Sequence, residues 1–192
     1  MTRTRQQFLE LLRAGLWGER ADESLFREGA DWKKILKTAR EQAVQSVVMD
    51  GIETLPAEAW PPREIIHRMM IDRTINIQMH RLLNRTVNEV AEALDAAGIP
   101  SVLLKGQGVA KNYARPESRS CGDIDLYVGE CNFRRAIEVI SGMQNDSLKV
   151  GIECDHHVQI SLNGIEIELH KKAGFMPGTR MNRDLQQWTI ES

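Results

Sequence analysis

Apolar residues recur at spacings of three and four through residues 1–98, which is the pattern of amphipathic helices. The pattern predicts one helix that ends near Gly15 to Gly18, a second from Trp32 to Val47, and a third after Pro62. Proline suits the first turn of a helix, and the third stripe continues to Gly98 as one long helix or two stacked ones. The apolar stripe of the first helix consists of Phe8, Leu9, Leu12 and Leu16.

Beyond Gly98 the pattern changes to short alternating runs, which are typical of β-strands. Runs at 99–104 and 123–128 are followed by a helix that Asn132 can cap. After a further strand, runs at 156–162 and 165–170 are joined by Asn163-Gly164, a strong hairpin signal because a type I′ turn needs positive φ at both central residues. We therefore predict an α+β protein, with a helical region over 1–98 and a small mixed-sheet core over 99–192.

Composition and charge narrow the class of protein without naming a partner. The chain has 192 residues, of which 42% are hydrophobic and 27% charged, as in a soluble globular protein. The net charge of −2 gives no global field for a polyanion, so long nucleic acid is not an expected partner. No apolar run suits a membrane span or a signal peptide, and three cysteines are too few for a disulfide framework, so we predict a cytoplasmic protein.

Acidic side chains gather on one face of two predicted strands. Alternation places Asp123 and Asp125 on the same face, about 7 Å apart at Cα. In the hairpin, Glu166, Glu168 and His170 share a face in the same way. If the two strands pair in register, three or four carboxylates converge and would favour a bound divalent cation. The alternative is that these residues form the solvated outer face of a half-buried sheet.

A glycine-containing turn precedes the paired aspartates. It reads Lys105-Gly106-Gln107-Gly108, between the end of a predicted strand and a short predicted helix. Backbone N–H groups in such a turn can bind phosphate. A phosphate-binding turn followed by paired aspartates is more specific than either feature alone.

Together these motifs resemble the nucleotidyltransferases of the DNA polymerase β superfamily, in particular a poorly characterised branch of it. The resemblance covers about residues 99–175 and implies a short mixed sheet with helices packed on one face. The motifs that carry it are Leu104-Lys105-Gly106, Tyr113, Arg119, Asp123-Ile124-Asp125-Leu126 and Glu168-Leu169-His170.

The resemblance implies Mg²⁺-dependent transfer of NMP from an NTP to a hydroxyl group of a small molecule or a protein. Asp123, Asp125 and Glu168 would hold two Mg²⁺ ions, with Glu166 as the substitute for Glu168. The triphosphate would be bound by Lys105, Gly106, Gln107 and Arg119. Gln107 stands where the wider superfamily usually has Ser, so this phosphate contact is either rebuilt or lost.

Two other functions are compatible with the sequence. One is a nucleotide-sensing or interaction module with little or no turnover, and the other is an adenylyltransferase of a toxin-like protein partner. Whichever function holds, we expect the region 1–98 to do more than support the sheet, because it is half of the chain and could form one wall of the cleft that selects the acceptor.

A second cluster, Cys154-Asp155-His156-His157, contains residue types that bind zinc, and Cys121 is a further candidate ligand. Adjacent histidines on a strand point to opposite faces, and the chain has no Cys-x-x-Cys pair. The sequence therefore does not favour a structural zinc site here.

Overall fold

The computed structural model describes residues 1–143, 148–174 and 178–191. The chain forms two compact units: unit 1 comprises residues 1–80 and 109–121, and unit 2 comprises residues 81–108 and 122–192. Residue 98, the sequence-based boundary, lies just after the longest helix, where helical structure gives way to strand. A division of the chain into domains at that residue stays a prediction.

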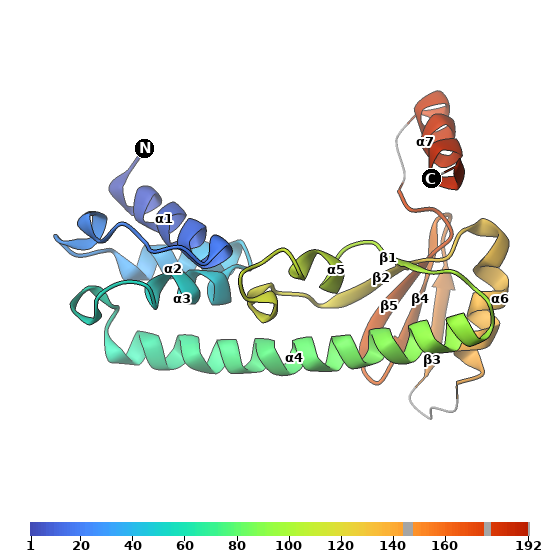
Figure 1. Cartoon of the computed structure of the whole chain (residues 1–192), viewed down its shortest axis with the longest axis horizontal. Coiled ribbons are helices and arrows are strands. Elements are labelled where there is room, and N and C mark those ends of the chain that lie inside the picture. Colours follow the sequence, from blue (N-terminus) through green and yellow to red (C-terminus); the bar gives the residue numbers. More distant parts are fainter. Residues whose placement is uncertain (144–147, 175–177, 192) are drawn as a thin grey trace. The chain divides into compact units, whose positions relative to one another are not determined.

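Unit 1 is helical, as the spacing of apolar residues predicts. A core of buried residues, among them Leu11, Ile35, Val48 and Ile52, holds its helices together. The elements of unit 1 are α1 (Arg3–Trp17), α2 (Trp32–Glu41), α3 (Gln45–Ile52), the first part of α4 (Arg63–Ala96) and the 3₁₀ turns η1 (Glu23–Phe26), η2 (Ala57–Ala59) and η3 (Pro116–Ser118) (Figure 1).

Two glycines set the close packing of α1 against α3. A Cβ atom at Gly15 would lie 1.9 Å from the carbonyl oxygen of Val47, and one at Gly51 would lie 2.1 Å from that of Leu11. Real side chains never approach so closely, so only glycine allows the two backbones to meet here. Leu11 is fully buried in the core of unit 1, whereas Leu9, which the apolar stripe of the first helix included, is 40% exposed.

The predicted helix from Trp32 to Val47 is wrong in one respect, because the chain breaks it in two. Helix α2 ends at Glu41 and α3 begins at Gln45. Between them Ala43 has φ of 53°, a left-handed conformation that no α-helix contains. In contrast, α4 is a single helix of 34 residues, which settles the choice that the sequence left open. None of the helices in the described ranges is both long enough and apolar enough to span a bilayer.

Unit 2 is built on a mixed five-stranded sheet in the order β1-β2-β5-β4-β3. Strands β2 and β5 are parallel, and the other neighbours are antiparallel. The helices of this unit are the second part of α4, the first half of the one-turn α5 (Gln107–Ala110), α6 (Glu130–Ser141) and α7 (Thr179–Glu191). The strands are β1 (Val102–Leu103), β2 (Asp123–Tyr127), β3 (Lys149–Glu153), β4 (His157–Leu162) and β5 (Ile165–His170) (Figure 1).

The two faces of the sheet differ sharply in polarity. Alternate residues of the three central strands are at most 3% exposed and form an apolar face, and α6 contacts β5 with Phe133, Ala136 and Ile140 buried on the helix. Since side chains alternate along a strand, the acidic residues project from the opposite face. The buried apolar residues of these strands are Ile124, Leu126, Val158, Ile160, Leu162, Ile165, Ile167 and Leu169.

Local turn chemistry explains the hairpin of β4 and β5. Asn163 and Gly164 have φ of 56° and 76°, as the predicted type I′ turn requires. The prediction that Asn132 caps α6 is wrong: Gly129 precedes the helix, and the Asn132 amide donates instead to the carbonyl of Val128 at 3.2 Å.

The order of the helices and strands and the mixed sheet confirm the predicted α+β fold.

Candidate active site

The predicted acidic faces of β2 and β5 lie side by side. In the parallel pairing of these strands, Asp123 is opposite Glu166 and Asp125 is opposite Glu168. Tyr127 and His170 complete the register. The in-register pairing, which was the condition for three or four carboxylates to converge, is therefore the arrangement that the sheet adopts.

Asp125 is the most buried acidic residue of this group, at 1% exposure. One of its oxygens, Oδ1, lies 2.8 Å from Nζ of Lys105 and 3.2 Å from Nε2 of His170. The same His170 nitrogen lies 3.3 Å from Oε2 of Glu168, so a single atom reaches both carboxylates. The hydrogen bond to Asp125 raises the pKa of Lys105, which keeps the lysine charged across the neutral range.

The carboxylates are neighbours, but their oxygens do not form a closed cluster. Among the described residues, Asp123, Asp125 and Glu168 are not one of the groups whose ligand atoms all lie within 4.8 Å of one another. Carboxylates repel one another unless a positive charge lies between them. In this structure the charged Lys105 ammonium neutralises Asp125, while Asp123 and Glu166 remain exposed.

The glycine turn is joined directly to β2. The N–H of Leu104 donates to the carbonyl of Asp125 at 3.0 Å, which places Lys105 next to the aspartate side chain. Gly106 has φ of 55°, so it supplies a left-handed conformation that other residues rarely adopt. The helix that follows is only one turn long, so its dipole adds little to phosphate binding.

Gln107 departs from the usual polar environment of an amide. Gln107 is only 7% exposed, and its side-chain atoms Nε2 and Oε1 are both buried without a hydrogen-bond partner. Burying an unsatisfied amide costs about 1–3 kcal/mol, so a position of this kind requires an explanation. One explanation is a ligand in the glycine turn, which agrees with the sequence-based expectation that Gln107 contacts the triphosphate.

Arg119 is described within unit 1 and is not among the residues that the sheet of unit 2 brings together. Its guanidinium donates to Sγ of Cys121 at 2.6 Å, and its carbonyl oxygen lies 2.8 Å from Nε2 of His80. Its predicted contact with the triphosphate stays a prediction.

A histidine cluster adjoins the carboxylates, and sequence reasoning underestimated it. Strand β4 begins at His157, so His156 belongs to the preceding turn and the two rings lie 4.4 Å apart. The argument from opposite strand faces was therefore wrong. Nε2 of His157 lies 3.9 Å from Oε1 of Glu168, and burial lowers the pKa of His157. The signal that could have revealed this residue is its place opposite His170 in the hairpin.

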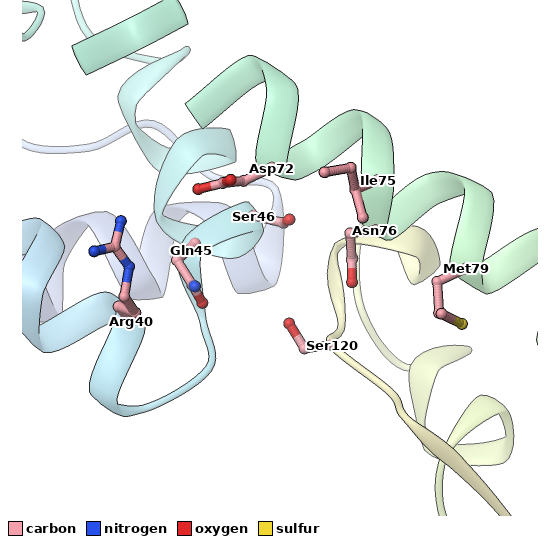
Figure 2. Close-up of a pocket in the computed structure, with 8 residues that line it drawn as sticks. All are labelled: Arg40, Gln45, Ser46, Asp72, Ile75, Asn76, Met79 and Ser120. Carbon is pink, nitrogen blue, oxygen red and sulfur yellow. The ribbon is translucent and has the colours of Figure 1, made fainter. Parts of the chain in front are cut away.

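Unit 1 contains a pocket of about 460 Å³ of its own. Figure 2 shows Arg40, Asp72, Asn76 and Ser120 among the residues that line it. A guanidinium, a carboxylate and an amide in one pocket suit a polar ligand, but no residue predicted for catalysis lines it.

A mixed sheet that carries an Asp-x-Asp strand in register with a Glu-x-Glu strand, beside a turn of lysine and glycine, is the arrangement that the resemblance to nucleotidyltransferases implies. A family model described as "uncharacterised nucleotidyltransferase" matches residues 28–192. The match extends over most of the chain and over both units, and the chain belongs to this family. Searches of curated proteins and of solved structures give no significant match.

Proposed function

We propose that this protein is a Mg²⁺-dependent nucleotidyltransferase that moves NMP from an NTP to a hydroxyl group of a small molecule or a protein. One observation carries the proposal: β2 and β5 pair in register, so that Asp125 lies beside Glu168 and Asp123 beside Glu166. Membership of the family supports nucleotidyl transfer in general. The metal, the nucleotide and the acceptor are inferred from the chemistry of the site.

The residues present fit a divalent cation. Asp125 is buried, and burying an ionised carboxylate costs free energy unless a positive charge or hydrogen bonds compensate it. Lys105 supplies that charge in this structure, at 2.8 Å. Carboxylate oxygens are the protein ligands that Mg²⁺ prefers, and the set that would hold it is Asp123, Asp125 and Glu168, with Glu166 as the substitute.

The side chains have separable roles in the reaction. Mg²⁺ at these carboxylates would neutralise the triphosphate and activate the acceptor hydroxyl. Lys105, when released from Asp125, can pair its ammonium with a triphosphate oxygen. The acceptor oxygen forms a bond to the α-phosphorus while the bond between that phosphorus and the α–β bridging oxygen breaks. Pyrophosphate leaves with the electron pair, and a carboxylate of the site accepts the hydroxyl proton.

The ion pair between Lys105 and Asp125 favours a second candidate function, a nucleotide-binding module without turnover. A lysine that occupies the carboxylate permanently would prevent the cation from binding. Calorimetry separates the two functions, because the module would bind NTP without any product forming. A protein acceptor, including a toxin-like partner, would be identified by an added nucleotide mass.

The proposal is tested with the full chain, Mg²⁺ and each of the four NTPs labelled at the α-phosphate, in the presence of candidate hydroxyl acceptors and co-purified proteins. Asp125→Asn should lower NMP transfer roughly 100-fold or more, in line with the loss of one charge-stabilising group. Glu138→Gln, on the exposed surface of α6, makes the same change of charge and should leave transfer unchanged. Equal transfer by wild type and Asp125→Asn would refute the proposed chemistry.

A further inference from the structure

We propose that Cys154, His156 and His157 form a binding site for a transition-metal cation of the Zn²⁺ type. The site lies in the turn between β3 and β4, next to the acidic face of the sheet. Thiolate and imidazole ligands select such a cation over Mg²⁺, which prefers oxygen. The site is therefore chemically different from the one proposed for the carboxylates.

The backbone holds this turn in a closed form. The N–H of Cys154 donates to the carbonyl of His157 at 2.9 Å, which closes the turn on itself. The N–H of Lys171 donates to the carbonyl of His156, also at 2.9 Å, and ties the turn to the end of β5. Because both bonds are made by the main chain, the three side chains project from a fixed frame.

The three ligand atoms already lie close together. Sγ of Cys154 lies 3.4 Å from Nδ1 of His157 and 3.9 Å from Nδ1 of His156. A tetrahedral zinc ion, with Zn–S of about 2.3 Å and Zn–N of about 2.0–2.1 Å, separates a sulfur and a nitrogen ligand by about 3.6 Å. The observed separations lie on either side of this value, so an ion requires only small side-chain rotations.

His157 connects this site to the carboxylates. Its Nδ1 faces Cys154, whereas its Nε2 lies 3.9 Å from Oε1 of Glu168. A cation on Nδ1 fixes the proton on Nε2, and a metal-bound histidine commonly donates that proton to a carboxylate. Occupancy of the turn would thus orient Glu168. This consequence rests on the proposed function, whereas the metal site itself does not.

A rival arrangement uses the same histidine. His157, Glu168 and His170 also place one ligand atom each within 4.8 Å of one another. A cation bound there would engage no sulfur. The presence or absence of a thiolate ligand therefore separates the two arrangements.

The test is a Co²⁺ titration of the reduced full chain without nucleotide. We expect one equivalent to bind, with a thiolate-to-cobalt charge-transfer band and the visible bands of tetrahedral cobalt, and Zn²⁺ should displace it. Cys154→Ser should abolish the charge-transfer band. Cys131→Ser, which removes an exposed thiol on α6, should retain it.

His156→Asn provides a second variant in case Cys154→Ser changes the fold, which far-UV circular dichroism checks. It should weaken Co²⁺ binding roughly 10-fold or more, because even the loss of a residue that only hydrogen-bonds to a metal ligand lowers metal affinity about 10–100-fold. Absence of the charge-transfer band from the wild type, or its persistence in Cys154→Ser, would overturn the proposal. Since no NTP is used, either result is independent of nucleotidyl transfer.

Discussion

Nζ of Lys105 lies 2.8 Å from Oδ1 of Asp125, whose side chain is only 2% exposed although the lysine side chain is 61% exposed. The lysine therefore brings its charge from solvent to a buried carboxylate at the centre of the acidic face. The pairing connects the glycine turn to β2, and it is the contact that a bound cation would have to replace.

Replacing Lys105 with methionine should destabilise the protein. Asp125 would keep His170 as its partner but lose the ammonium, and leaving a buried acceptor short of a partner costs about 1–3 kcal/mol. The pKa of Lys105 is raised by its hydrogen bond to Asp125, so the stabilisation is fully present below the ordinary lysine value of about 10.4 and is lost as pH rises through the raised pKa. Urea denaturation at neutral pH measures the loss.

Lys149→Met, on the exposed surface of β3, is the matched control and should leave the free energy of unfolding unchanged. A Lys105→Met variant as stable as this control would show that the ion pair contributes nothing.

The two glutamates of β5 should differ in their effect on catalysis. Glu168 lies opposite the buried Asp125 and 3.3 Å from His170, whereas Glu166 is exposed and lies opposite Asp123. Glu168→Gln should therefore lower NMP transfer roughly 100-fold, and Glu166→Gln should change it little. Initial rates at saturating Mg²⁺ and NTP measure both. The reverse order would assign the third carboxylate to Glu166.

Stability should fall as pH decreases from about 7.5 to 5.5, and His157 should account for part of the fall. Burial lowers the pKa of His157 in the folded protein below its unfolded value of about 6.5. As pH falls, the unfolded chain therefore binds a proton on His157 before the folded chain does. The contribution of neutral His157 to the free energy of unfolding is fully present above the unfolded pKa and is lost as pH falls through the folded pKa. Urea midpoints at the two pH values measure the change.

His157→Gln keeps a polar side chain but removes the titrating ring, and its urea midpoint should change less than that of the wild type over the same pH interval. An identical pH dependence in both proteins would exclude His157 as a source of the effect.

Gly15→Ala should destabilise unit 1. Its new Cβ would lie 1.9 Å from the backbone oxygen of Val47, so α1 and α3 would have to move apart. Overpacking of this kind costs about 1–3 kcal/mol, which exceeds the gain of up to about 1 kcal/mol from replacing glycine within a helix. Thermal or urea denaturation reports the difference.

Gly122→Ala serves as the comparison, because a Cβ there meets no atom within 4 Å. If Gly15→Ala proved as stable as Gly122→Ala, the close approach of the two helices would be wrong.

Local patterns predicted the parts of the fold that depend on neighbours in sequence. Alternation along the strand placed Asp123 and Asp125 on one face of the sheet and the apolar Ile124 and Leu126 on the other, and the Asn163-Gly164 pair predicted its turn. In contrast, the helix break at Ala43 carries neither Gly nor Pro, so the sequence contains no sign of its positive φ.

Contacts between distant segments were beyond this reasoning. The pairing of Asp125 with Glu168 joins strands that are separated along the chain by one helix and two strands, and the sequence could offer it only as a condition. The ion pair of Lys105 with Asp125 depends on another pairing, because β1 must first lie against β2. The ring of His156 comes close to that of His157 because the strand starts one residue later than alternation suggested.

The order in which the chain passes through the two units also constrains how the protein could evolve by recombination. Residues 109–121 return to unit 1 after the chain has entered unit 2, so the backbone passes from one unit to the other three times. A single recombination between genes anywhere from residue 81 to residue 121 would combine part of one parent's unit with part of the other's. Inheritance of the helical unit and of the acidic sheet is therefore coupled, and neither can be exchanged as a module by one crossover.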